Sequence, residues 1–276
     1  MSKTSIGFIG GGNMASSLIG GLIADGWQAD CISVSDPDNQ CREHLSSRFS
    51  VHTTDNNLSI LNTSDVLVLA VKPQVMAEVT QPLAAAVQQN APLIISIAAG
   101  INMADLSRWL DGYHNIVRTM PNTPAMVQSG ATALYADSSV DQAGRDLAET
   151  VMRAVGLTLW VEKESLIDAV TAISGSGPAY FFYIMEAMEQ AGIDMGLSAE
   201  SARLLTIQTA FGAAKMALES DDDPGTLRQK VTSPGGTTER ALSIMEENQL
   251  KQIFGQALQA ACDRSQELAK ILGQNT

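Results

Sequence analysis

Four hydroxyl side chains and two adjacent glycines stand together in VTSPGGTT, residues 231–238. The glycine pair allows the backbone to approach a ligand closely. A helical pattern begins directly after the motif, and the unpaired N–H groups of a helix start suit a carboxylate or a phosphate. The oxygens of Ser233, Thr237 and Thr238 could instead accept hydrogen bonds from those N–H groups. The motif therefore predicts either an anion-binding loop or a well-capped connection between two helices.

A glycine-rich turn follows the first apolar run of the chain, residues 6–9. It reads Gly10-x-Gly12-x-x-Ala15, and a helical pattern follows it. In such a turn the first glycine permits a tight bend, and the second lets the backbone reach a pyrophosphate. The third, small residue keeps the helix close to the strand, so that the helix N-terminus faces the phosphates. The pattern predicts a dinucleotide-binding domain that begins near the N-terminus.

The second predicted strand, residues 31–35, ends at Asp36. An acid at this place usually binds the adenine ribose hydroxyls and disfavours a 2′-phosphate, which indicates NAD. Arg42 lies nearby and could meet a phosphate. Asp36 could also cap the helical segment that starts at Pro37. Two readings of Asp36 and two cofactors, NAD and NADP, therefore stay open.

The elements that must position these residues follow from the hydrophobic pattern. Apolar runs alternate with helical patterns, which predicts a doubly wound α/β domain over residues 1–162. Two polar residues follow strands: Lys72 could contact a cofactor or be a solvated lysine, and Asn122 could hold a nicotinamide carboxamide or a rigid turn. Further strands are predicted at residues 66–71, 93–98, 115–118, 131–135 and 157–161, with a helix at 141–155 between the last two.

Beyond Glu162 the hydrophobic period changes from 2 to 3.6, which predicts an all-α domain over residues 163–276. A second Gly/Ser loop, SGSGP at 174–178, opens one of its helices. Helices that are apolar on several faces indicate a protein partner as well as an internal core. Helices are expected at residues 166–172, 179–190, 199–219, 238–246 and 249–272.

Composition narrows the function classes. The 276 residues include 17 Lys plus Arg and 30 Asp plus Glu, a net charge of -13. Such a chain is a poor candidate for nucleic acid or for an anionic membrane surface. Three cysteines without a CxxC pair, no apolar run long enough to span a membrane and no signal-like start indicate a cytoplasmic protein. No metal-ligand spacing occurs among the histidines or cysteines, so no metal site is expected.

The chain also lacks an obvious general base. None of the three histidines lies beside a plausible nucleophile, and no HExxH, GxSxG or GxxxxGK[ST] motif occurs. A dinucleotide-binding domain without such a base suits hydride transfer to a C=N bond that is already electrophilic.

Five motifs together resemble pyrroline-5-carboxylate reductase. They are GFIGGGNMA at 7–15, AVKPQ at 70–74, MPNTPA at 120–125, SGSGPAY at 174–180 and VTSPGGTT at 231–238. The resemblance implies reduction of 1-pyrroline-5-carboxylate to L-proline by NAD(P)H, the final step of proline biosynthesis. It implies a Rossmann domain and a helical domain that interlocks with a second copy. Active sites would then form between one subunit's Rossmann domain and its partner's helices, in dimers that often assemble into decamers.

Residue roles carried over from the resemblance place Ile9 to Met14 at the pyrophosphate and Met120 to Asn122 at the nicotinamide. Thr238 would bind the imine nitrogen and relay its proton. The full cofactor set would be Ile9, Gly10, Gly11, Gly12, Asn13, Met14, Ser35, Asp36, Asn57, Ala70, Val71, Lys72, Pro73, Ala98, Met120, Pro121 and Asn122. The substrate set would be Asp221, Ser233, Gly235, Gly236, Thr237 and Thr238. This sequence departs from the family pattern at two positions. Asp36 stands where NADP-preferring relatives have a less acidic residue, and Lys230 stands where an Asn is common.

Two alternatives remain. A 3-hydroxyacid dehydrogenase of the 6-phosphogluconate type shares the Rossmann-plus-helices plan, but its chemistry needs a lysine in the helix after the Gly/Ser loop. Residues 178–192 contain none. A non-catalytic NAD(P) sensor would bind the cofactor without turning over a cyclic imine.

Overall fold

The computed structural model describes residues 4–274 and divides into two compact units. Of the described residues, the first unit contains residues 4–176 and 260–274. The second unit is Gly177–Gln259.

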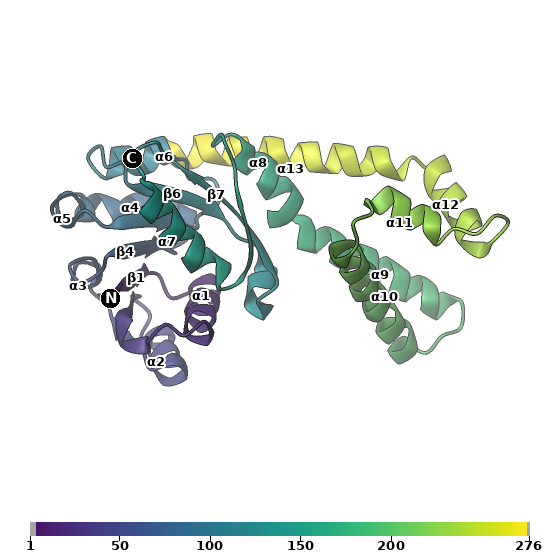
Figure 1. Ribbon diagram of the computed structural model, residues 1–276, viewed down its shortest axis with the longest axis horizontal. Coiled ribbons are helices and arrows are strands. Elements are labelled where there is room, and N and C mark those ends of the chain that lie inside the picture. The colour runs from purple at the N-terminus through teal and green to yellow at the C-terminus, as the bar shows by residue number, and fades with distance from the viewer. Residues whose placement is uncertain (1–3, 275–276) are drawn as a thin grey trace. The chain divides into compact units, whose positions relative to one another are not determined.

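The first unit is built on one sheet with helices packed against it (Figure 1). Its described strands have the order β3-β2-β1-β4-β5-β6-β7-β8. All neighbours pair in parallel except β6 and β7, which are antiparallel. The predicted α/β class with a Rossmann-type sheet is confirmed. The strands are β1 (Ile6–Ile9), β2 (Ile32–Ser35), β3 (His52–Thr54), β4 (Val66–Leu69), β5 (Leu93–Ser96), β6 (Ile116–Met120), β7 (Gly130–Ala136) and β8 (Gly156–Trp160).

The central strands are buried on both faces, which explains their continuous apolar sequences. Alternate side chains of β4 enter opposite cores: Val66 and Val68 join one cluster, and Leu67 and Leu69 join the other. The first cluster is covered by α1 (Asn13–Ala24), α2 (Asn39–Phe49) and α7 (Gln142–Arg153). The second is covered by α3 (Asn57–Leu61), α4 (Met76–Thr80), α5 (Ala84–Asn90) and α6 (Met103–Trp109).

The chain reverses direction across the sheet between β1 and β4. From β1 the next strand lies on one side, and from β4 the next strand lies on the other. The two carboxyl ends are joined by a hydrogen bond of 2.8 Å from the Ala70 N–H to the Ile9 carbonyl. Ligands of doubly wound sheets bind outside the carboxyl ends of strands at such a switch point.

Two later segments pack with the sheet. The first contains α8 (Leu166–Val170) and a π-helical turn, η5 (Thr171–Gly175). The second is the end of α13 (Leu250–Gly273), where the Ser265 hydroxyl donates to the Asp168 carboxylate at 2.7 Å and Leu272 enters the second core cluster. Packing therefore groups these residues with the sheet, although the hydrophobic period changes at Glu162. Residues 163–276 as a functional domain stay a prediction.

The second unit is helical. It contains α9 (Gly177–Asp194) and α10 (Ala199–Glu219), which pack side by side, then α11 (Pro224–Lys230), α12 (Thr237–Glu247) and the first part of α13. Few of its side chains are buried within the unit. Its exposed large apolar side chains include Phe181, Phe182, Tyr183, Leu204, Phe211 and Leu218.

The elements predicted by residue range exist, and the structure adds others, since α3 to α6 were expected only as part of the strand–helix alternation. β3 and α11 have no counterpart in the sequence prediction, because one has only three residues and the other follows a charged turn. Asp223 forms the start of α11 by accepting bonds from the N–H groups of Gly225 and Thr226. Short 3₁₀ turns complete the chain: η1 (Ala29–Cys31), η2 (Pro73–Val75), η3 (Gln81–Leu83) and η4 (Thr123–Val127). Among residues 4–274 no helix is long and apolar enough to cross a membrane.

Candidate functional site

The bend at Gly10 requires glycine on two grounds. Its φ of +97° lies in the left-handed region, and a Cβ there would lie 2.7 Å from the Ala70 carbonyl oxygen. Its N–H donates to the Ser35 carbonyl at 2.8 Å, which ties the bend to the end of β2. The loop is therefore held between the ends of three neighbouring strands.

Gly12 differs from Gly10 because space is open around it. It is the N-cap residue of α1, and no atom lies within 4 Å of where its Cβ would be. Ala15, one turn later, is 1% exposed and packs in the first core cluster. An unobstructed helix start against a fixed bend has the donors and the room that a pyrophosphate needs. The glycine loop and the start of α1 therefore fit the pyrophosphate of a dinucleotide.

Asp36 is engaged with the backbone on both of its oxygens. Oδ2 accepts the Gly11 N–H at 2.7 Å, and Oδ1 accepts the Asp38 N–H at 2.9 Å. Asp38, rather than Asp36, caps α2, by accepting from the Gln40 N–H at 2.9 Å. The reading of Asp36 as the helix cap is therefore wrong. Each oxygen keeps a second lone pair, so binding of the ribose hydroxyls stays a prediction.

Arg42, the cation nearest to Asp36 in sequence, is bound to the loop itself. Its Nη1 donates to the carbonyl oxygens of Asp36 at 2.7 Å and of Pro37 at 3.0 Å. Its Nη2 donates to Asn39 Oδ1 at 3.0 Å. A 2′-phosphate would have to compete with three oxygens for this guanidinium, because Arg42 already stabilises the turn after β2.

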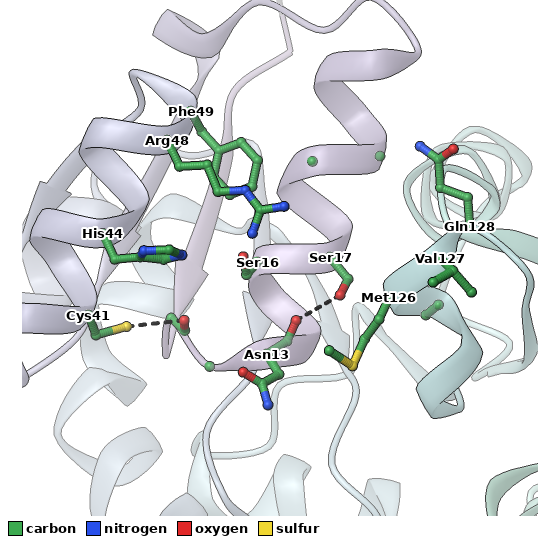
Figure 2. A pocket seen from close by; sticks show the side chains of 15 residues that line it. Asn13, Ser16, Ser17, Cys41, His44, Arg48, Phe49, Met126, Val127 and Gln128 are labelled. Carbon is green, nitrogen blue, oxygen red and sulfur yellow. Dashed lines mark hydrogen bonds between the residues drawn. The ribbon is translucent and has the colours of Figure 1, made fainter. Parts of the chain in front are cut away.

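A cleft of about 690 Å³ begins at the glycine loop and follows α1 (Figure 2). α2 forms one wall and η4 with the residue after it forms the other. His44 and Arg48 are its ionisable side chains besides Cys41, and no carboxylate lines it. In a chain with a net charge of -13, the cleft lining is therefore locally free of carboxylates, although Asp36 binds the loop from behind. Its lining residues are Gly11, Gly12, Asn13, Ser16, Ser17, Gly20, Gly21, Cys41, His44, Arg48, Phe49, Ala125, Met126, Val127 and Gln128.

The remaining predicted cofactor residues lie near the carboxyl ends of the strands. Asn57 begins α3, whose cap is the side chain of Asn56. Lys72 is exposed and precedes η2, with Pro73 at its first position. Ser35 directs its hydroxyl to the Phe8 carbonyl at 3.4 Å, so it could meet a cofactor chiefly through its backbone. Others of this set are Ile9 and Ala98, which are buried, and Met14, Ala70 and Val71, which are half-buried.

Asn122 joins three segments of the first unit. Its side-chain oxygen accepts the Ala131 N–H at 2.8 Å, and its side-chain nitrogen donates to the Ser174 carbonyl at 3.0 Å. It is 9% exposed. Nearby, a Cβ on Gly175 would lie 2.6 Å from Met120 Cε, so the π-helical turn packs closely on the end of β6. The amide is already committed to holding this turn, and contact with nicotinamide stays a prediction.

The VTSPGGTT loop lies in the second unit and precedes α12. Gly235 has φ +70°, and Gly236 is the N-cap residue without a side-chain capping bond. The prediction that Ser233, Thr237 or Thr238 caps this helix is wrong. Instead, Glu239 Oε2 reaches back to accept the Gly235 N–H at 2.7 Å.

The absence of a hydroxyl cap leaves donors at the helix start. The side chains of Thr237 and Thr238 are exposed, and their amides have no hydrogen-bond partner within residues 4–274. A carboxylate could accept from these amides, while the threonine hydroxyls stay available to a second group. Elsewhere in the unit, Asp221 is exposed, and Lys230 forms an ion pair with Asp222.

Comparison with known proteins decides the family. The chain is 50% identical to the pyrroline-5-carboxylate reductase of Pseudomonas aeruginosa over 274 residues, covering 99% of this chain and 100% of that protein. This chain belongs to the pyrroline-5-carboxylate reductase family. The model for pyrroline-5-carboxylate reductase dimerisation matches residues 164–268, and the model for NADP oxidoreductase, coenzyme F420-dependent, matches residues 5–100.

Solved structures of the family agree over the whole chain. A pyrroline-5-carboxylate reductase from Coxiella burnetii has a TM-score of 0.93 at 45% identity, covering 97% of this chain and 99% of that one. The Plasmodium falciparum enzyme with NADP bound has a TM-score of 0.86 at 29% identity, covering 98% and 99%.

Three residues that support these segments escaped the sequence prediction. Cys41 donates to the Gly11 carbonyl, Glu239 accepts the Gly235 N–H, and the buried Arg118 forms an ion pair with the half-buried Glu164 at 2.7 Å. Spacing could have indicated Glu239, because it lies three residues after the N-cap, where a carboxylate commonly reaches back to the helix start. Within the described residues, no cluster of His, Cys, Asp and Glu could hold a metal ion.

Proposed function

We propose that this protein reduces 1-pyrroline-5-carboxylate to L-proline with NADPH or NADH, the final step of proline biosynthesis. The observation that carries the proposal is full-length membership of the family, at 50% identity to a relative of that name. The glycine loop supports it, because the bend at Gly10 and the open helix start at Gly12 suit a dinucleotide pyrophosphate.

The chemistry needs little acid–base assistance from the protein. When bound, the nicotinamide supplies a hydride to C5 of the ring, and the C=N electron pair becomes an N–H bond once a proton arrives at nitrogen. The free amides of Thr237 and Thr238 suit the substrate carboxylate. We assign the Thr238 hydroxyl to the ring nitrogen, where it would donate a hydrogen bond and relay the proton. Ser233, Gly235, Gly236 and Asp221 complete the proposed substrate set.

The test of activity is loss of nicotinamide absorbance in the presence of pyrroline-5-carboxylate, with NADH and NADPH compared. No oxidation with either cofactor would refute the proposal. Cofactor binding without turnover would favour a non-catalytic sensor, and turnover of a 3-hydroxyacid would favour the dehydrogenase alternative.

The role of Thr238 is tested by substitution. Thr238→Ala should lower turnover on the order of 10²-fold, as for other lost transition-state donors, and Thr238→Ser should restore most of it. Ser243→Ala, on the same helix, is the matched control, since its hydroxyl donates to Glu247 one turn along. Full turnover in Thr238→Ala would show that the proton comes from elsewhere.

Cofactor preference is assigned to Asp36. Asp36→Ala should raise the use of NADPH relative to NADH, because a carboxylate repels a 2′-phosphate. It should also weaken both cofactors, because the Gly11 N–H loses its acceptor. An unchanged ratio with a uniform loss would make Asp36 a loop residue only.

The helical unit supports a homodimer. Large apolar side chains such as Phe181, Phe182 and Leu218 are 64%, 64% and 85% exposed, which is costly to leave in water. Light scattering of the purified protein should show a dimer or a multiple of it, with five dimers as the decamer that the family resemblance implies. Phe182→Glu should lower that mass, whereas a monomeric wild-type protein would refute the assembly.

A cytoplasmic location, with no nucleic acid or membrane as partner, completes the proposal, and cell fractionation tests it.

A further inference from the structure

One peptide segment of the glycine loop is held from two sides by side chains. The Gly11 N–H donates to Asp36 Oδ2 at 2.7 Å. The Gly11 carbonyl accepts the Cys41 thiol at 3.1 Å (Figure 2). We propose that Cys41 is a positioning residue for the cofactor, which acts by fixing the orientation of the Gly11–Gly12 peptide. The inference rests on the proposed dinucleotide function of this loop.

Contact between α2 and the loop is tight. A Cβ on Gly11 would lie 2.8 Å from Cys41 Sγ and 2.7 Å from Leu45 Cδ1, well inside van der Waals distance. α2 therefore lies directly behind Gly11. The contact between the thiol and the carbonyl also fixes the spacing between α2 and the loop. It therefore leaves the loop little freedom to move.

The planarity of the peptide bond transmits this contact to Gly12. In a trans peptide the carbonyl of Gly11 and the N–H of Gly12 lie in one plane and point in opposite directions. Because the carbonyl points to Cys41 on the α2 side, the N–H of Gly12 points away from α2. Gly12 is also the residue whose side-chain position is open. The thiol thus presents this N–H to the space available for a pyrophosphate.

The thiol has the protonation state that the role requires. Burial raises the pKa of the Cys41 thiol, and the negative charge of the nearby Asp36 raises it further. Cys41 therefore stays a neutral S–H donor at physiological pH, and a thiolate facing the Gly11 carbonyl is disfavoured.

Three substitutions separate the hydrogen bond from the packing. Cys41→Ser keeps a donor, Cys41→Val keeps bulk without a donor, and Cys41→Ala removes both. Cys262→Ala in α13 is the matched control for loss of a thiol. We measure the dissociation constant of NADH and of NADPH by nicotinamide fluorescence, and kcat and KM for both substrates. Far-ultraviolet circular dichroism checks that each variant is folded.

Loss of the donor should weaken cofactor binding about three- to tenfold in Cys41→Ala and Cys41→Val, the effect of one hydrogen bond. KM for the cofactor should rise by the same factor, while kcat at saturating cofactor and KM for the imine stay near wild type. Cys41→Ser should recover binding to within about twofold of wild type.

Two results would overturn the assignment: unchanged cofactor affinity in Cys41→Ala, or recovery by Cys41→Val equal to that by Cys41→Ser, which would assign the effect to packing. If Cys41→Ala does not fold, the Ser and Val variants still decide between the two. Failure of the proposed function has a different signature, in which the wild-type protein binds cofactor but reduces no cyclic imine.

Discussion

Replacement of Asn122 by alanine is the most direct test of how the loop after β6 is held. The side chain is 9% exposed and makes two hydrogen bonds, from the Ala131 N–H at 2.8 Å and to the Ser174 carbonyl at 3.0 Å. Truncation leaves a backbone donor and a backbone acceptor without these partners. Each unsatisfied buried group costs about 1–3 kcal/mol, so the loss of two partners in Asn122→Ala should lower the free energy of unfolding by about 2–6 kcal/mol.

Urea unfolding followed by circular dichroism measures this loss. Protein concentration must be identical for all variants, because association contributes to the apparent stability. Asn90→Ala is the control, since Asn90 is exposed and donates to the Asn62 side chain at 2.9 Å. The control should change the free energy of unfolding by no more than about 0.5 kcal/mol. A result for Asn122→Ala within that range would refute the view that this amide holds the loop.

Asn122→Asp adds a pH readout. The carboxylate could still accept from the Ala131 N–H, but its second oxygen would face the Ser174 carbonyl without a proton between them. Burial and this repulsion would raise the pKa of the new carboxyl above its unfolded value. The destabilisation should therefore be full above the folded pKa and fade as pH falls toward the unfolded pKa, where a protonated carboxyl can donate. A deficit that does not depend on pH would contradict this explanation.

Two further variants test the loop and the acid stability of the first unit. Gly10→Ala places a Cβ 2.7 Å from the Ala70 oxygen at φ +97°, so cofactor affinity should fall at least about tenfold, as measured by nicotinamide fluorescence; near-normal affinity would contradict it. For Glu149, the hydrogen bond from Trp160 leads the causes that lower the pKa. Its stabilisation is therefore present at neutral pH and is lost as pH falls through the folded pKa. Glu149→Gln should lower the urea midpoint at pH 7 and approach wild type near pH 3; equal deficits at both values would exclude this linkage.

The sheet could be predicted from sequence because its strands are buried on both faces. β1, β4 and β5 are continuous apolar runs, and they are too short to form ordinary helices, so a buried strand is the expected structure. β3 escaped because His52–Thr54 has three residues, one of them exposed, and no apolar period. It exists because its backbone pairs with β2, a contact that local sequence does not encode.

The glycine loop was predictable in type but not in its supporting contacts. The spacing of Gly10, Gly12 and Ala15 follows from backbone requirements that only small residues meet. The bond from the Cys41 thiol to Gly11 depends on the distance between α2 and the loop, across 30 residues of chain. The prediction that a hydroxyl of VTSPGGTT caps the following helix failed, because the presence of a hydroxyl does not fix the rotamer that points it at the helix start. Glu239 accepts the Gly235 N–H instead.

The order of the two units along the chain bears on how the protein is made. The sheet unit is interrupted after Ser176 and resumes at Ala260, so the helical unit is synthesised before the sheet unit is complete. Until the last helix emerges from the ribosome, the core cluster lacks Leu272, Arg108 lacks its bond to the Gly273 carbonyl, and Asp168 lacks the Ser265 hydroxyl. The sheet unit is thus the first of the two units to begin folding and the last to be completed. During translation, a partly open apolar face coexists with the exposed helices of the second unit, a period in which chaperone binding would protect the nascent chain.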